Sequence, residues 1–455
     1  MADNPVFPTL SSGSGATAPG DQANDFRFGS RFSNPPPRPL GAAAFCGLAG
    51  EIVRRIAPHT EADEAALLGT NLVYYGNCVG RSPHFQIGGD RHATNLNISL
   101  VGPTASRKGS AERTIGQPYR EADPYWYGRC INSGLSSGEG IIHAVRDAVW
   151  ETRATRRNGE TTTDEVLVDA GVEDKRLLVI QEEFAGALKA MERHGNTLSA
   201  IMRQAYDGLT LRTMTKTPMQ ATDPHISCIF HIGKYELNLT FGTVESANGL
   251  GNRIIWVWVK RSKSLPHGGS LNADELLSLV DRLAAVIQFG RSVGRMIRSP
   301  EANEIWESEY PRLSAERPGL YGCMVARAAP QVLRMSMIYA LMDGLDFIMP
   351  EHLLAALEYW RYSDESVRFI FGGRLGDPVA DRILESLRTA GIEGLTRSEI
   401  SEVLQRNTQS HAIEASLQML VDGGLATWRN EVTAGRPLQR WFAIEMDPSR
   451  PQSTA

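Results

Sequence analysis

The sequence predicts an α/β protein whose core is a parallel β-sheet, with helical regions before and after it and a small C-terminal module. Three observations favour this fold class. Short apolar runs between residues 96 and 270 alternate with amphipathic segments, as expected of strands joined by helices. Residues 272–371 have almost purely helical periodicity. Residues 377–445 contain three helical patterns and then two strand patterns joined by a glycine-containing turn, which is the order of a winged helix-turn-helix.

Length, charge and cysteine usage bound the class of protein. A chain of 455 residues is long enough for two or three domains. Its net charge of −5 means that any nucleic-acid surface must be a local patch. The five cysteines are widely spaced and form no CxxC, which favours a reducing cytoplasm over a disulfide framework or a zinc ribbon. No apolar run approaches ~20 residues and the N-terminus does not resemble a secretory signal, so we expect a cytoplasmic protein without a membrane span.

The composition divides the chain into consecutive segments. Residues 1–40 are rich in Gly, Ser, Ala and Pro, which predicts a disordered tail. The following segments are an N-terminal helical region (41–95), the sheet-containing core (96–270), a helical lid (271–375), the winged-helix domain (376–446) and a short tail (447–455). Strands are expected in "HFQIGG", "ATNLNISLVG", "RLLVIQEEF", "HISCIFHI" and "RIIWVWVKR", and a helix is expected in "VRDAVWETR".

The loop "GPTASRKGS" between a strand and a helix follows an altered GxxxxGK[ST] pattern. Lys108 keeps the position of the lysine, but Arg107 replaces the usual glycine and Gly109 displaces the hydroxyl to Ser110. A phosphate loop needs backbone N–H groups around the phosphate, a lysine, and a hydroxyl on Mg²⁺, for which Thr104 is the alternative to Ser110. The loop predicts a P-loop NTPase core with ATP and Mg²⁺ as cofactors; the alternative is an ordinary Gly/Ser turn. The candidate cofactor-binding residues here are Gly102, Thr104, Arg107, Lys108, Gly109 and Ser110.

Acidic residues follow a buried strand farther along the chain. In "RLLVIQEEF" the apolar run leads into Gln181, Glu182 and Glu183. A carboxylate at this edge of a parallel sheet can hold Mg²⁺ and its neighbour can polarise an attacking water. We therefore expect Glu182 to act at the metal and Glu183 as the catalytic base, whereas the alternative is a helix N-terminus that favours acids.

Other candidates carry less specific signals. Arg253, the first residue of "RIIWVWVKR" and just before its apolar run, could be an arginine finger for a neighbouring subunit or a surface residue in a polar turn. His231, at the end of "HISCIFHI", could contact a γ-phosphate or be a satisfied core histidine. Arg212 and Lys216 lie in an expected hairpin and form either a DNA-binding or a merely solvated basic face.

These motifs, in this order, resemble the AAA+ core of MCM-type replicative helicases. "SGLSSGEGIIHAVRD" is similar to the small-residue stretch of that family, and Glu182–Glu183–Phe184 to its Asp-Glu-Phe. The resemblance implies an AAA+/RecA-like parallel sheet, a ring that is a hexamer or similar, and a DNA-contacting hairpin over "DGLTLRTMTKTP". It also implies that Arg253 is the arginine finger and that Arg327, in "ARAAPQVLR", is the second sensor. His231 stands where the family has a sensor asparagine.

The segments "RKGS", "SGLSSGEG", "GNTLS" and "RSKSLPHGG" also resemble an uncharacterised bacterial family of P-loop proteins, some encoded on mobile elements near primase-polymerases. This resemblance implies DNA and a primase-polymerase as candidate partners. Both resemblances imply a helicase-like ATPase in the replication of DNA or mobile elements.

The sequence therefore predicts a ring-forming, ATP-dependent DNA motor. The alternative is an ATP-gated DNA-binding initiator or regulator that does not unwind DNA. A nuclease or transferase without ATP chemistry has no paired acid cluster or Cys/His metal spacing to support it. In the winged helix, the residues expected to contact DNA are Arg397, Arg406 and Arg436, although such domains also dock proteins.

Overall fold

The computed structural model describes residues 34–157, 160–214, 218–241, 248–317, 319–372, 377–422, 424–431 and 438–444. Lys216 and Arg436, two of the expected DNA-contacting residues, lie outside the described residues.

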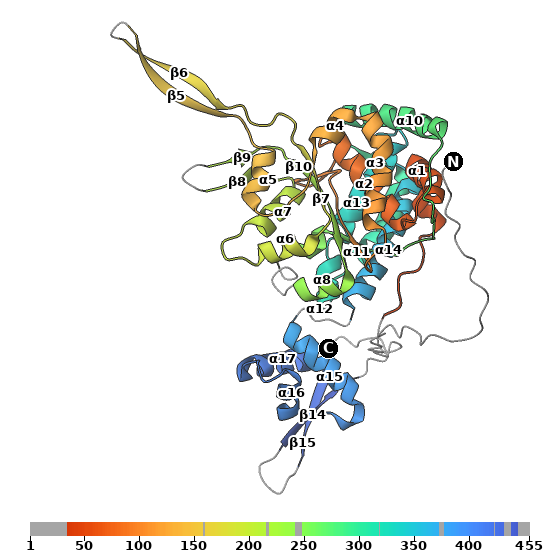
Figure 1. Cartoon of the computed structure of the whole chain (residues 1–455), viewed down its shortest axis with the longest axis vertical. Helices are drawn as coiled ribbons and strands as arrows, with labels where there is room; N and C mark the ends of the chain where they lie inside the picture. Colours follow the sequence, from red (N-terminus) through yellow and green to blue (C-terminus); the bar gives the residue numbers. More distant parts are fainter. Residues whose placement is uncertain are drawn as a thin grey trace, which may run out of the picture. The chain divides into compact units, whose positions relative to one another are not determined.

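A five-stranded parallel sheet forms the centre of the larger part of the chain (Figure 1). Its strand order is β11-β3-β10-β7-β4, and each neighbouring pair is parallel. Apart from the short edge strand β4, the strands are mostly buried and rich in apolar residues, as a sheet covered on both faces requires. The expected α/β class is thereby confirmed, and all five strands end at the same edge. They are β3 (Asn97–Val101), β4 (Ile131–Asn132), β7 (Arg176–Gln181), β10 (His225–Ile232) and β11 (Ile255–Trp258).

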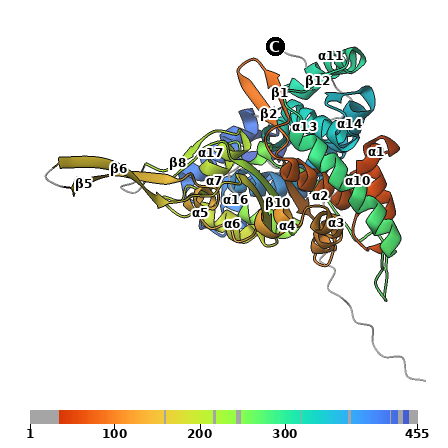
Figure 2. The same ribbon diagram turned by 90° about the horizontal axis from the view of Figure 1, so that it is seen from above.

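Helices cover the sheet from both sides (Figures 1 and 2). Helix α2 (Glu64–Val79) packs against β3, β7 and β10 and is almost wholly buried, whereas α6 (Phe184–Met191) and α7 (Leu198–Tyr206) pack against β10. The long α14 (Pro350–Phe371) packs on β11. One hydrophobic core runs from Ala44 to Phe371, so the expected N-terminal region, core and lid share it.

Other helices and minor strands complete this part, and among them α13 is almost wholly buried. Among the described residues, no helix combines the length and the apolar character needed to cross a membrane. The helices are η1 (Ala42–Phe45), α1 (Gly47–Ile56), η2 (Ala57–His59), α3 (Lys108–Ala122), α4 (Pro124–Arg129), α5 (Gly138–Ala144), α8 (Lys234–Thr240), η3 (Gly251–Arg253), α10 (Ala273–Ser292), α11 (Pro300–Ser314), α12 (Gly319–Val325) and α13 (Ala328–Met342). The minor strands are β1 (His84–Ile87), β2 (Asp90–Ala93), β12 (Ile297–Arg298) and β13 (Phe347–Ile348).

Contacts with α14 begin before residue 41, where we placed the end of the N-terminal tail. The Asn34 side-chain amide donates a hydrogen bond to the Arg368 carbonyl at 2.9 Å. Arg38 forms an ion pair with Glu365, with a shortest distance of 2.6 Å. Residues 34–40 therefore lie along α14.

The prediction of a helix in "VRDAVWETR" is wrong. Its residues enter β5 (Val149–Arg157), which pairs with β6 (Glu160–Asp169) as a long antiparallel ribbon that extends away from the sheet (Figures 1 and 2). Aromatic and β-branched residues favour strands, and Asn158–Gly159 between the two runs is a strong hairpin signal in the sequence. The hairpin expected around Arg212 is confirmed by the pairing of β8 (Leu211–Arg212) with β9 (Gln220–Ala221).

The C-terminal module has its own hydrophobic core, which includes Leu384, Leu417 and Trp441. The expected helices and hairpin are present, and an additional strand, β14, completes an antiparallel sheet of order β14-β16-β15. A capping box between Thr396 and Glu399 starts its second helix. The elements are α15 (Pro378–Ala390), η4 (Gly391–Glu393), β14 (Leu395–Thr396), α16 (Arg397–Val403), α17 (Ser410–Asp422), β15 (Ala426–Glu431) and β16 (Leu438–Ala443).

Candidate functional site

A pocket of about 310 Å³ lies at the carboxyl edge of the parallel sheet. The loop after β3, the start of α3 and the ends of β7 and β10 contribute to it. This is the edge at which open α/β sheets bind ligands, because the strand-to-helix loops meet there. Its lining residues are Ala105, Ser106, Arg107, Lys108, Gly109, Ser110, Arg113, Glu182 and His231.

The Lys108 ammonium is held by its own loop. Its Nζ donates to the carbonyl oxygens of Gly102 at 3.3 Å and Pro103 at 3.1 Å, and to Ser106 Oγ at 3.1 Å. Burial lowers the pKa of Lys108 from its ordinary value. These partners keep the cation at the mouth of the loop, where it could neutralise an anionic ligand.

The loop backbone is tightly constrained. Ala105 and Arg107 both have a φ of 63°, in the left-handed region, where a side chain costs roughly 1–2 kcal/mol. Gly102 is needed for close approach, because a Cβ there would lie 2.3 Å from the Val259 carbonyl oxygen. Arg107 is thus a strained residue at a position where the usual pattern has glycine.

His231 presents an unmet hydrogen-bonding atom to this pocket. Its side chain is 3% exposed, and its Nε2 is buried without a hydrogen-bond partner among the described residues. Burial, together with the nearby charges of Lys108 and Arg113, lowers the pKa of His231 to about 4, so the ring is neutral at pH 7. A buried, unpartnered nitrogen at a pocket wall is available to bond a ligand or a water in the pocket.

The two acids after β7 occupy different positions. Glu182 lines the pocket, is 63% exposed and lies 3.8 Å from Arg113 Nη1. Glu183 is the exposed N-cap residue of α6 and is outside the lining. Ser110 and Glu182 are both pocket residues with oxygen ligands, which are the type that Mg²⁺ prefers.

The expected arginine finger and second sensor lie elsewhere and meet at one carboxylate. Arg253 Nη2 is 2.6 Å from Asp207 Oδ2, and Arg327 Nη1 is 2.9 Å from Asp207 Oδ1. Arg334, which is buried, stacks on the ring of Tyr206 beside them, with its guanidinium 4.0 Å from the ring centroid. Arg253 precedes β11, so this cluster belongs to the amino edge of the sheet, opposite the pocket.

The structure thus brings together only part of the predicted site. Thr104 is exposed and, like Gly102, Glu183, Arg253 and Arg327, is not among the pocket-lining residues. The prediction overlooked Ser106, Arg113 and Asp207. Arg113 follows Ser110 by three positions on α3, so helical spacing could have identified it. Asp207 had no local signal.

The described DNA-contact candidates differ in their surroundings. Arg212, on β8, is exposed. In the C-terminal module, Arg397 pairs with Glu414 at 2.5 Å and Arg406 with Glu402 at 2.8 Å. Residues 377–444 contain nine acids against seven arginines and no lysine, so the module as a whole is not basic.

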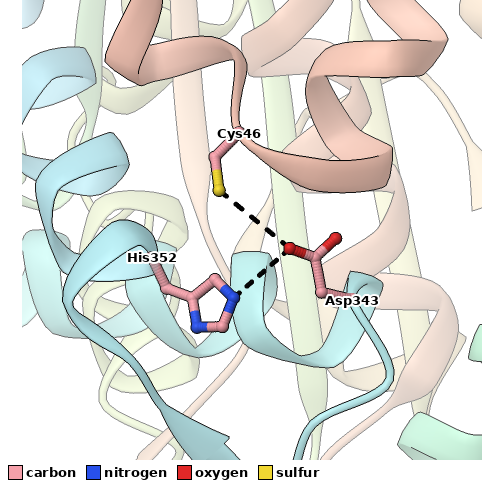
Figure 3. A group of neighbouring side chains, drawn as sticks. All are labelled: Cys46, Asp343 and His352. Atoms are coloured by element: carbon pink, nitrogen blue, oxygen red, sulfur yellow. Dashed lines mark hydrogen bonds and ion pairs between the residues drawn. The ribbon is translucent and has the colours of Figure 1, made fainter.

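A second polar cluster joins the start of α1 to α13 and α14 (Figure 3). His352 Nε2 is 3.3 Å from Asp343 Oδ2, and Cys46 Sγ is 4.0 Å from the same oxygen. The Met349 N–H donates to His352 Nδ1 at 3.0 Å, so Nε2 carries the ring proton and is not free to bind a metal. Burial and Asp343 raise the pKa of Cys46 to about 11, which keeps the thiol protonated. Asp343 also accepts from the Leu48 N–H at 2.8 Å, so the cluster is a structural cap.

Comparison of the sequence with protein-family models gave no match, and a search of curated proteins gave none.

Proposed function

We propose that the chain is an ATPase and that the pocket at the carboxyl edge of the sheet binds the phosphates of ATP with Mg²⁺. The observation that carries the proposal is the convergence of Lys108, Ser110, Glu182 and His231 from three parallel strand ends on one pocket. The N-terminus of α3, a 15-residue helix, points its free N–H groups and positive dipole end at the same place. The unpartnered Nε2 of His231 leaves a hydrogen-bonding atom available to a ligand in this pocket.

Each pocket residue has a role that its chemistry supports. Lys108 exchanges its loop oxygens for phosphate oxygens, and the backbone N–H groups of the loop surround the phosphates. Ser110 and Glu182 hold Mg²⁺, which when bound offsets the negative charge of the phosphates. Glu183, beside Glu182, positions and polarises the attacking water. Neutral His231 donates one hydrogen bond from its ring N–H to an oxygen of the terminal phosphate.

The strand order supports an AAA+-type core. β10, which ends in His231, lies between β3, which leads into the phosphate loop, and β7, which leads into the acids. AAA+ ATPases also place a strand between these two. The shared core of α2, α13 and α14 with the sheet holds this edge rigid.

The arginine cluster supports a ring. Arg253 and Arg327 lie together at the edge opposite the pocket of their own chain, and Asp207 orients both. Two guanidinium groups at one point fit the phosphate charge of a neighbouring subunit, where an arginine finger can contribute ~10³-fold or more to hydrolysis. We therefore propose that the ATPase assembles head to tail into a closed ring.

Charge directs the proposed DNA contact to the β8–β9 hairpin. The β5–β6 ribbon, residues 149–169, has five acids and three arginines, whereas residues 208–218 contain Arg212 and Lys216 and no acid. Exposed Arg212 is the described residue of this hairpin that is suited to a phosphate contact. The winged-helix module, with Arg397 and Arg406 paired to acids, contributes less to DNA affinity than its arginine content alone suggests.

An ATPase assay on the full chain, with and without single-stranded or forked DNA, tests the proposal. We expect Mg²⁺-dependent phosphate release that DNA stimulates and that Lys108→Ala abolishes. Strand separation on the fork distinguishes a motor from an ATP-gated DNA-binding protein. Absence of nucleotide binding and of hydrolysis under all these conditions would refute the proposal.

A further inference from the structure

Arg107 occupies an unusual position in the loop. It has a left-handed backbone, which glycine adopts freely and an arginine does not. Its side chain is 43% exposed and lines the same pocket as Lys108. A side chain that is strained at this position must be compensated by a contact that glycine could not make.

In the structure that contact is with Glu61, from the turn between η2 and α2. Arg107 Nε lies 2.6 Å from Glu61 Oε2. The other oxygen of Glu61 accepts from the Leu265 N–H at 2.6 Å and from Arg261. The Leu265 N–H and the arginines hold the pKa of the Glu61 carboxyl at about 2, so it is an anion at neutral pH.

Glu61 can lose Arg107 without being left unpaired. Arg261 and the Leu265 N–H would remain on its other oxygen, and the Ser262 N–H donates to the Glu61 backbone carbonyl at 3.0 Å. Removing the only partner of a charge is costly, but here the carboxylate has a second cation. The Arg107–Glu61 pair is therefore a contact that a competing anion in the pocket can replace.

We propose that Arg107 is a second phosphate-binding cation of this pocket and that Glu61 holds its guanidinium aside until phosphate competes for it. The inference rests on the proposed nucleotide site and deepens it. An arginine is suited to such an exchange because its planar fork binds a carboxylate and a phosphate with the same geometry. The segment 261–265, which stays on Glu61, fixes the position to which Arg107 returns.

The experiment measures binding of a fluorescent ATP analogue with Mg²⁺, and its displacement by inorganic pyrophosphate, on the full-length protein. Arg107→Gly restores the usual loop pattern and removes strain, yet we expect it to weaken binding of both probes about tenfold or more, because a charge-assisted hydrogen bond is lost. Glu61→Gln removes the competitor, and we expect binding about two- to fivefold tighter. Glu51→Gln, which removes a carboxylate of α1 paired with Arg55 of the same helix and Arg282 of α10, is the matched control and should bind as the wild type does.

If the Arg107–Glu61 pair had a purely structural role, the two substitutions would change probe binding in the opposite directions. Glycine would then bind equally or more tightly, and Glu61→Gln would loosen the loop and weaken binding. Arg107→Lys, which keeps the charge, should bind both probes more tightly than Arg107→Gly. It replaces the glycine variant in the test if that variant does not fold. One outcome would overturn this inference and leave the proposed function standing. In that outcome Lys108→Ala abolishes probe binding, whereas Arg107→Gly and Glu61→Gln leave it unchanged. Failure of the wild type to bind either probe would overturn the proposed function and the inference with it.

Discussion

Asp207→Asn is the substitution that most directly tests the arginine cluster. The aspartate accepts from Arg253 at 2.6 Å and from Arg327 at 2.9 Å through separate oxygens. Asparagine keeps the shape but offers one acceptor and no charge. The side chains of Asp207, Arg253 and Arg327 are 26%, 12% and 34% exposed, so solvent screens the pairs only in part.

The expected loss of stability follows from these contacts. A hydrogen bond to a charged group contributes about 1.5–3 kcal/mol, and partial exposure reduces that value. Arg253 keeps one bond, to the Gly249 carbonyl at 2.8 Å, whereas the charges of Arg253 and Arg327 are no longer offset by Asp207. We expect Asp207→Asn to lower the free energy of unfolding by about 2–3 kcal/mol, an effect large enough to measure by urea unfolding.

A double-mutant cycle isolates the interaction energy between Asp207 and Arg253. Asp207→Asn, Arg253→Gln and the double variant should give an interaction energy of about 1–2 kcal/mol. Asp223→Asn is the matched control, because Asp223 is 70% exposed and pairs with Arg81 at 3.3 Å, and it should cost less than about 0.5 kcal/mol. If Asp207 orients the arginines for a neighbouring site, Asp207→Asn should also slow ATP hydrolysis while nucleotide binding stays intact. An interaction energy near zero, with normal hydrolysis, would refute both the pairing and the orienting role.

Further expectations concern the pocket. Lys108→Ala should abolish hydrolysis and leave the fold intact, as phosphate release and circular dichroism would show; turnover at the wild-type rate would contradict the phosphate-loop assignment. Glu183→Gln should bind ATP and fail to hydrolyse it, whereas unchanged turnover would assign the base elsewhere. Because burial lowers the pKa of His231 to about 4, the unfolded chain takes up a proton below pH 6.5 that the folded chain excludes. Stability should therefore fall as pH drops from about 6.5 to 4, by up to about 3 kcal/mol for this group, and His231→Gln should lack that part of the loss in urea unfolding at pH 7 and 4.5.

Four of the five sheet strands could be predicted because they are rich in apolar residues, whereas β4, with only two residues, gives no such signal. β7, β10 and β11 are buried on both faces, so no alternation obscures them. Parallel strands carry their loops to one edge, and this brings Lys108, Glu182 and His231 together without any knowledge of distances.

The rest depends on pairings that local sequence does not encode. Asp207 follows α7, and its partners lie 46 and 120 positions farther along the chain. Glu61 precedes Arg107 by 46 positions and has no pattern that marks it as a partner. The β5–β6 ribbon is different, because its Asn158–Gly159 signal was present in the sequence and the helical interpretation overlooked it.

The position of Arg253 limits how it can act. The Asn97 side-chain amide donates to the Arg253 carbonyl at 3.2 Å, which fixes Arg253 beside the first residue of β3. The strand then rises through five residues to Gly102, about 17 Å at the usual spacing, before the loop reaches Lys108. Asp207 holds the guanidinium at the far end of that distance. A phosphate that Arg253 contacts in this conformation must therefore belong to another molecule, so pocket and arginine cluster can work together only across an interface between two copies of the chain.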